Sequence, residues 1–157
     1  MIAKEKLNIL WSLEQTAEKY EDRVAVSDVN QELTWKELVK KAQVIGAELS
    51  EKVQPGNPVP VLLEKSSETL AVMLGIVYAG CFYVPVNPMN PTERLRKIME
   101  KLDPEVIISD EKGKEQLAAV GNGLENKVMG PEALKTATGT ELSEEQYDKK
   151  IPRRNFP

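Results

Sequence analysis

The sequence predicts an α/β fold in which helices flank a mainly parallel sheet, preceded by an amino-terminal helix and a β-hairpin. Three short apolar runs, at residues 59–63, 82–86 and 106–108, alternate with segments of helical periodicity, and this order is typical of β-α-β units. The connections between them are short, which favours parallel strands joined by right-handed crossovers. Ahead of this unit, strand-like segments at residues 24–27 and 33–35 flank a polar turn, as in a hairpin.

The first helix is predicted from Lys6 to Tyr20, where apolar residues recur at helical spacing. The second helix is predicted to begin after Thr34, because Glu37 lies three residues later and the two residues form a capping-box signature. This helix should run to about residue 49 and bury one stripe of side chains, namely Leu38, Ala42, Ile45 and Leu49.

Residues 59–63 lack polar alternation, which is typical of a strand buried on both faces. Pro60 cannot donate a main-chain hydrogen bond, so it is predicted to lie at the start of this strand. Ser66 or Ser67 should then cap a helix from about Glu68 to Ala79 that ends before a glycine. That helix is apolar nearly all round, which predicts deep burial.

Residues 82–86 are the next predicted strand, and a helix follows it. Asn90 is predicted to be the N-cap of this helix, with Pro91 at its first helical position. Residues 106–108 are predicted to form a third buried strand. The helix between these two strands should bury a stripe made of Leu95, Ile98, Met99 and Leu102.

The periodic signal weakens after Asp110. A helix is predicted at residues 114–120 and a short strand at residues 127–129. Residues 111–157 are therefore expected to be less regular than the preceding part and connector-like at their end.

The last stretch of the chain is polar, with another capping-box signature at Ser143 and Gln146. Residues 151–157 contain two prolines and two arginines and are expected to form an extended connector. We therefore predict that residues 1–157 are a single domain, a partial amino-terminal subdomain of a larger protein.

Charge and composition exclude several functional classes. The formal net charge of −4 offers no overall positive field for nucleic acid or anionic lipid. The chain has no histidine, which rules out Ser-His-Asp and Cys-His catalysis, and its single cysteine, Cys81, cannot form an internal disulfide. No apolar segment is long enough for a signal peptide or a membrane span. A cytoplasmic protein without nucleic-acid or membrane partners is therefore expected.

The search for a catalytic or ligand site finds no strong candidate. The sequence contains no glycine-rich phosphate loop and no clustered metal ligands. Trp35 is best explained as a helix-start residue, Arg94 as a member of a structural ion pair, and Cys81 as a buried thiol. A binding role for Trp35 and an anion contact for Arg94 are the less favoured alternatives. Glu93 and Glu100 flank basic residues at the spacing of surface ion pairs.

Two segments resemble core motifs of the adenylate-forming superfamily, which includes acyl-CoA synthetases, luciferases and the adenylation domains of nonribosomal peptide synthetases. Residues 33–38, LTWKEL, resemble its first motif, L-[TS]-Y-x-E-L. Residues 78–87, YAGCFYVPVN, resemble its second, K-A-G-x-A-Y-[LV]-P-[LI]-D, and residues 88–95 match P-x-x-P-x-x-R-[LI]. The resemblance extends from about residue 13 to residue 110. It is strongest to amino-acid adenylation domains and D-alanine–carrier protein ligases.

The resemblance implies the amino-terminal part of an AMP-binding ligase. Such an enzyme joins a carboxylic acid to AMP from Mg2+ and ATP, then transfers the acyl group to a thiol of CoA or of a phosphopantetheine carrier protein. The family's phosphate loop, T-S-G-[ST]-T-G-x-P-K-G, and its catalytic lysine have no counterpart in residues 1–157. No catalytic, cofactor-binding or metal-binding residue is therefore assigned to this chain, which is expected to be inert alone. Its expected partners are the remainder of the ligase and, through exposed apolar surface, other copies of itself.

Several motif positions differ from the family pattern, among them Trp35 in place of a tyrosine, and two of them change a charge. Tyr78 replaces a lysine, and Asn87 replaces an aspartate whose charge would support helix capping or ion pairing. Two other interpretations stay open. One is a complete, non-catalytic module of the same fold that binds a carrier protein, a ligase partner or a nucleotide-like ligand. The other is an unrelated doubly wound domain.

Overall fold

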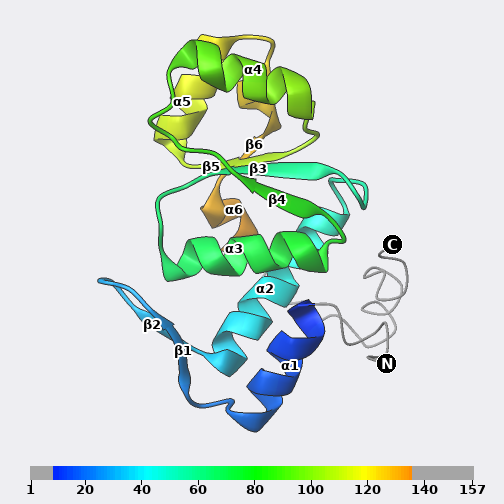
Figure 1. Ribbon diagram of the computed structural model, residues 1–157, viewed down its shortest axis with the longest axis vertical. Coiled ribbons are helices and arrows are strands. Elements are labelled where there is room, and N and C mark those ends of the chain that lie inside the picture. The colour runs from blue at the N-terminus through cyan, green and yellow to red at the C-terminus, as the bar shows by residue number, and fades with distance from the viewer. Residues whose placement is uncertain (1–8, 136–157) are drawn as a thin grey trace.

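A computed structural model describes residues 9–135 of the chain (Figure 1). Helices and strands follow one another in the order α1 (Ile9–Lys19), β1 (Val24–Ser27), β2 (Glu32–Thr34), α2 (Trp35–Ser50), β3 (Pro58–Leu62), α3 (Ser67–Tyr78), β4 (Phe82–Pro85), α4 (Thr92–Leu102), β5 (Ile107–Ser109), α5 (Glu111–Val120), the 3-10 helix η2 (Leu124–Lys127), β6 (Val128–Met129) and α6 (Pro131–Lys135). The predicted fold class is confirmed.

The amino-terminal part consists of α1, the hairpin and α2. β1 and β2 pair in antiparallel fashion, as predicted. The predicted capping box is also present: the Thr34 hydroxyl accepts from the Glu37 amide at 3.3 Å, and the Glu37 carboxylate accepts from the Thr34 amide at 2.8 Å. The predicted stripe of α2 is buried, namely Leu38, Ala42, Ile45 and Leu49.

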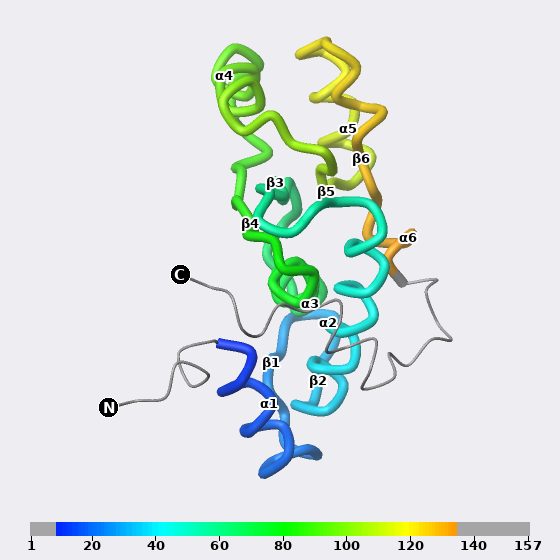
Figure 2. The backbone as a smooth tube through the Cα atoms, turned by 90° about the vertical axis from the view of Figure 1, so that its right-hand side faces the viewer, coloured from blue at the N-terminus to red at the C-terminus, as the bar shows by residue number. Residues whose placement is uncertain are grey.

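The remaining strands form a parallel sheet of order β4-β3-β5-β6 with a hydrophobic cluster on each face. On one face, residues of α1, α2, α3 and α6 pack against Val59 and Val61 of β3. On the other face, α4, α5 and η2 pack against Leu62 of β3 and Ile107 of β5. Figure 2 shows the sheet between these two helical layers, with the β4 edge on one side and β6 on the other.

The position predicted for Pro60 is wrong. Pro60 is the middle residue of β3, a strand flanked by β4 and β5, and it is fully buried. The Val61 carbonyl accepts from the Val86 amide at 3.0 Å, so the main-chain groups of Val61 point toward β4. Main-chain groups alternate in direction along a strand, so the position of the missing Pro60 amide faces β5. Pairing with β5 begins only at Val61, and the proline therefore removes no ladder hydrogen bond.

The predicted start of α4 also needs a correction. The N-cap residue is Pro91, whose carbonyl accepts from the amides of Arg94 and Leu95, and no side chain caps the helix. Asn90 is not the cap, because it belongs to the preceding turn, where its amide donates to the Asn87 carbonyl at 3.0 Å.

Residues 110–135, which follow β5, differ from the prediction in two details. α5 begins at Glu111, earlier than predicted, because Asp110 caps it through a hydrogen bond from the Gly113 amide at 2.8 Å. The predicted short strand is present as β6, and α6 was not predicted. The second capping box and the terminal connector lie outside the described residues.

Candidate functional site

The carboxyl ends of β3 and β5 are where an open parallel sheet of this order would bind a ligand. β3 leads into α3 on one face of the sheet, whereas β5 leads into α5 on the other. Ligands of doubly wound folds bind in the crevice that such a reversal creates. The candidate site is therefore built by residues 63–66 after β3 and by Asp110 after β5.

The polar groups after β5 shape the chain itself. Ser109 is buried, and its hydroxyl donates to the Leu62 carbonyl at 3.3 Å and contacts the Asp110 carbonyl at 3.2 Å. The Asp110 carboxylate accepts from the Gly113 amide and caps α5. These groups hold the end of β5 against β3 and start the next helix.

The loop after β3 is stabilised in the same way. The Ser66 hydroxyl accepts from the Thr69 amide at 3.1 Å and is the N-cap of α3. The Thr69 hydroxyl donates to the Glu64 carbonyl at 2.6 Å, inside the same turn. Among residues 9–135, no group of three carboxylate, cysteine or histidine side chains could hold a metal ion. The donor set described here therefore does not fit Mg2+ and ATP by itself.

A polar network joins the hairpin turn to the start of α3. The Asp28 carboxylate accepts from the Ser67 hydroxyl at 2.6 Å and the Ser67 amide at 2.8 Å, and from the amides of Asn30 and Gln31 at 2.8 and 3.1 Å. The hydrogen bonds from the Ser67 hydroxyl, the Ser67 amide and the Asn30 amide hold the pKa of Asp28 well below its usual range. Sequence reasoning missed this network because its partners are 39 residues apart.

The same network extends to α2. The Gln31 amide group donates to the Ser67 hydroxyl at 3.0 Å and to the Glu68 carboxylate at 2.8 Å, and Glu68 also pairs with Lys41 of α2. The start of a helix attracts anions through its exposed amides. Here a carboxylate of the protein, that of Asp28, takes this position on α3. The network therefore fastens the hairpin to the sheet domain and leaves this helix start no clear role in binding phosphate.

Replacing Asp28 by asparagine should destabilise the protein at pH 7. Both carboxylate oxygens of Asp28 accept hydrogen bonds, whereas the NH2 group of asparagine can only donate. The pKa of Asp28 is lowered on folding, so the carboxylate's contribution is complete above its ordinary value of 3.8 and is lost as the pH falls below that value. Urea unfolding of D28N and of the exposed control D22N, at pH 7 and at acidic pH, measures this. A D28N penalty no larger than that of D22N, or equally large under acid, would contradict the assignment.

The sequence candidates Trp35 and Cys81 have structural roles. Trp35 is half-buried at the first position of α2, and its amide donates to the Arg23 carbonyl at 3.0 Å. Cys81 is buried, and its thiol donates to the Gln54 carbonyl at 3.3 Å. Burial raises the pKa of the thiol, which disfavours the nucleophilic thiolate.

The charged residues of α4 lie on its surface, as predicted. Arg96 pairs with Glu93 at 2.7 Å and with Glu100, and these carboxylates raise the pKa of the Arg96 guanidinium. Lys97 lies 3.7 Å from Glu93. The ion pair expected for Arg94 is not present within the described part of the chain, where Arg94 is exposed.

The two motif departures that change a charge, at Asn87 and Tyr78, each have a clear local role. Asn87 accepts from the Met89 amide at 2.9 Å through its side chain, so it shapes the turn after β4 without the charge of an aspartate. The Tyr78 side chain is buried at 1% exposure, and its hydroxyl donates to the Glu14 carboxylate at 3.0 Å. This hydrogen bond links the end of α3 to α1.

Replacing Tyr78 by phenylalanine should cost about 1 kcal/mol of unfolding free energy, because the Glu14 carboxylate loses a partner. Y83F is the matched control, since Tyr83 is 40% exposed and its hydroxyl has no hydrogen bond within residues 9–135. Chemical unfolding of both variants measures the difference. Equal stabilities of Y78F and Y83F would show that the hydroxyl contributes nothing to the attachment of α1.

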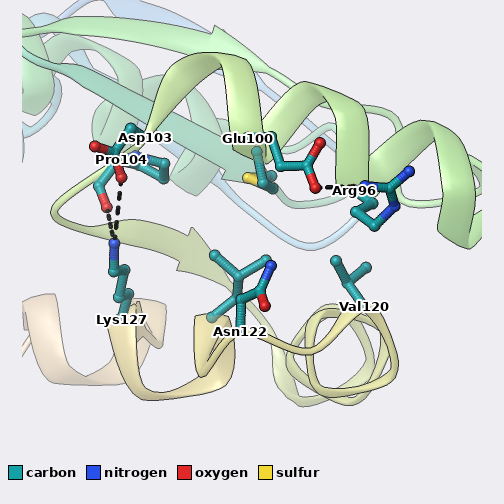
Figure 3. Close-up of a pocket in the computed structure, with 9 residues that line it drawn as sticks. Arg96, Glu100, Asp103, Pro104, Val120, Asn122 and Lys127 are labelled. Atoms are coloured by element: carbon teal, nitrogen blue, oxygen red, sulfur yellow. Dashed lines mark hydrogen bonds and ion pairs between the residues drawn. The ribbon is translucent and has the colours of Figure 1, made fainter.

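A hollow of about 190 Å3 opens at the other end of the strands, near the amino ends of β5 and β6 (Figure 3). Its rim carries Arg96 beside Glu100, and Lys127 beside Asp103 and the Pro104 carbonyl. Both cations thus have anionic or carbonyl partners, which weakens any attraction for phosphate. The hollow also lies at the amino ends of the strands, whereas folds of this kind bind ligands at the carboxyl ends.

No helix within residues 9–135 has the length and apolar character that crossing a membrane requires. The sequence matches the AMP-binding enzyme family over residues 13–155. It is 36% identical over 113 residues to a mycosubtilin synthase of Bacillus subtilis, and 32% identical over 122 residues to tyrocidine synthase 1 of Brevibacillus parabrevis. These matches cover 71% and 77% of this chain but 4% and 11% of the two synthases.

Solved structures also match most of this chain, and each match covers only a part of the solved chain. VinN in complex with 3-methylaspartate matches with a TM-score of 0.73 and 26% identity, over 88% of this chain and 37% of the VinN chain. The nonribosomal peptide synthetase FmoA3, in an AMPPNP-bound form, matches with a TM-score of 0.69 and 26% identity, over 80% of this chain and 14% of that chain. The chain therefore belongs to the AMP-binding enzyme family, as the amino-terminal portion of an adenylate-forming ligase domain whose relatives are the adenylation domains of nonribosomal peptide synthetases.

Proposed function

We propose that this chain is the scaffold-forming part of a ligase that activates an amino acid as its acyl-adenylate, using ATP and Mg2+, and transfers it to a thiol. The acceptor thiol belongs to a phosphopantetheine carrier protein or to CoA, and the enzyme works in the cytoplasm. Residues 1–157 form one structural unit of that ligase, and residues 111–157 lead toward the rest of it.

The family membership over residues 13–155 is the observation that carries this proposal. Support for an amino acid as the substrate comes from the relatives, which include the synthases of mycosubtilin and bacitracin, and from VinN, which has been solved with 3-methylaspartate and with L-aspartate. Support for ATP comes from the AMPPNP-bound form of FmoA3.

The described residues contribute architecture to this reaction. The hydrogen bonds of Asp28, Ser66 and Ser109 hold the hairpin and the loops at the carboxyl edge of the sheet in place. None of the side chains on that edge forms a metal cluster within residues 9–135. We therefore propose that the chain alone is catalytically inert, and that the groups that contact the nucleotide are supplied by the part of the ligase that follows in its relatives.

The proposal is tested by expressing the complete natural protein that contains this chain. Amino-acid-dependent exchange of labelled pyrophosphate into ATP is measured with each amino acid in turn, beside the isolated 157-residue chain. We expect exchange with one or a few amino acids from the complete protein and none from the isolated chain. No exchange from the complete protein would contradict the ligase assignment, and exchange from the chain alone would contradict its inertness.

A further inference from the structure

The ends of two helices meet at the hollow near the amino ends of β5 and β6 (Figure 3). α4 ends at Leu102 and α5 ends at Val120, so both helices present their carboxyl-terminal turns there. The last carbonyl groups of a helix carry partial negative charge and attract cations. The hollow therefore favours a positively charged group beside the ends of α4 and α5.

The floor of the hollow is apolar and small. It includes the buried side chains of Met99 on α4, Leu124 on η2 and Pro104 before β5. The volume of about 190 Å3 exceeds the ~150 Å3 of an apolar cavity that holds benzene, and it is below the ~300 Å3 at which pockets for drug-sized ligands begin. The floor thus suits a single aliphatic or aromatic side chain and is too small for a nucleotide.

The two ends of the hollow carry different charges (Figure 3). At one end Arg96 is shared between Glu93 and Glu100, so the charge of Glu100 is only partly neutralised. At the other end Lys127 lies 3.9 Å from the carboxylate of Asp103, whose side chain is 93% exposed. An exposed ion pair of that length neutralises little charge. The hollow therefore offers an anion at one end and a cation at the other.

Two residues that line the hollow have unusual main-chain conformations. Asp103 has a φ of 42° and Asn122 a φ of 60°, and they are the residues other than glycine with positive φ among residues 9–135. Such conformations are uncommon and cluster at turns and binding sites. Asn122 lies across the hollow from α4 (Figure 3), and its side-chain amide has no hydrogen bond within the described residues. This amide can donate to a bound carboxylate.

We propose that the hollow binds a free α-amino acid with an apolar side chain. The ammonium group of the ligand lies beside Glu100 and the carboxyl ends of α4 and α5. Its carboxylate accepts hydrogen bonds from Lys127 and from the Asn122 amide, and its side chain covers Met99 and Leu124. The bound amino acid thereby joins α4 to η2.

The spacing and the signs of the charges select this ligand. Glu100 lies about one helical turn, roughly 5 Å, from the end of α4 beside which Lys127 lies. An α-amino acid carries both its charges on one carbon atom, and a charge-assisted hydrogen bond on each side extends its reach to that distance. A phosphate ion has no positive group for Glu100 and no side chain for the apolar floor. The hollow is separate from the carboxyl ends of the strands, so this inference goes beyond the proposed function and does not depend on it.

Chemical-shift titration of the isotope-labelled 157-residue chain tests the site, with L-leucine as the probe. We expect saturable amide shifts at Asn122, Leu124 and Lys127, with half-saturation on the order of 1 mM for so small a ligand. Two analogues each lack one charge: 4-methylpentanoate lacks the ammonium group, and 3-methylbutylamine lacks the carboxylate. Each analogue should bind about 10-fold more weakly than leucine, because a charge-assisted hydrogen bond is lost.

Two variants test the charged ends of the hollow. E100Q and K127Q should each weaken leucine binding by about 10-fold, because each removes one charged partner of the ligand. E100Q changes an exposed side chain and keeps the fold. K101Q is the matched control, since Lys101 is exposed on α4 outside the hollow and its variant should bind leucine as the wild type does. In the complete natural protein, leucine should slow hydrogen exchange of residues 122–127, and E100Q should reduce this slowing.

The outcomes separate this site from the proposed ligase reaction. Shifts that stay linear in leucine concentration well beyond the millimolar range overturn the site. An analogue that binds as tightly as leucine, or inorganic phosphate that displaces leucine, overturns the zwitterionic ligand. Saturable shifts confined to Lys65 and Asp110 place the amino acid at the carboxyl ends of the strands and overturn the hollow as its site. Leucine binding at the hollow without pyrophosphate exchange in the complete protein supports this inference and overturns the ligase activity.

Discussion

Replacing Gly75 by alanine should destabilise the protein by on the order of 3 kcal/mol, a large fraction of the stability of a domain of this size. An added Cβ at Gly75 would lie 2.4 Å from Cγ2 and 2.6 Å from Cβ of Ile45 on the facing helix. Helix propensity alone predicts the opposite sign, since alanine favours a helix over glycine by about 1 kcal/mol. The steric clash of the added Cβ with α2 should outweigh that gain.

The reason is that glycines on both helices allow this close crossing. An added Cβ at Gly46 would lie 2.5 Å from Cβ of Tyr78 and 3.0 Å from the Gly75 carbonyl. These neighbours lie close to the main chain and cannot move away without separating the helices. G46A should therefore show a penalty similar to that of G75A.

Chemical unfolding of both variants measures the effect. G56A serves as the control, because an added Cβ there would meet no atom within 4 Å and only the positive φ of 86° opposes it. Its cost should be about 1 kcal/mol. A G75A protein as stable as the wild type would contradict the close crossing.

Replacing Gly113 by alanine should cost about 2 kcal/mol, because the added Cβ would lie 2.0 Å from the Ser109 hydroxyl. That hydroxyl is buried and donates to the Leu62 carbonyl, so it cannot rotate away without losing the hydrogen bond. S109A removes the obstructing oxygen and leaves Cβ of residue 109 at 3.4 Å from the new Cβ, an ordinary contact.

A double-mutant cycle tests this prediction. S109A alone should cost about 1 kcal/mol for the lost hydrogen bond. The loss of unfolding free energy in S109A/G113A should be smaller than the sum of the losses in the two single variants by about 1 kcal/mol or more. If the two losses measured by urea unfolding were additive, a Cβ at position 113 would not clash with the Ser109 hydroxyl, and the prediction would be contradicted.

Most of the fold could be predicted because its signals are local. The capping box at Thr34 and Glu37, the N-cap at Ser66 and the apolar strands each need only a few neighbouring residues. Pro60 was misplaced because the cost of a missing amide depends on where β5 begins to pair, which local sequence does not contain. The N-cap at Pro91 was missed because Asn90 satisfies a turn with Asn87 instead.

The candidate site shows the same limit more strongly. The sequence offered no catalytic residue, and the described carboxyl edge contains hydrogen bonds that shape loops. The network of Asp28 could not be predicted, since its partner Ser67 comes from another element and neither residue belongs to a periodic pattern. Contacts between distant elements require the fold, whereas helix starts and buried strands do not.

The most direct test of the central claim is to sequence the source DNA beyond the codon for Pro157. If this chain is the amino-terminal portion of an adenylate-forming ligase, the reading frame continues into a segment resembling T-S-G-[ST]-T-G-x-P-K-G. A stop codon immediately after Pro157 would contradict the account and would make the protein a non-catalytic module of the same fold.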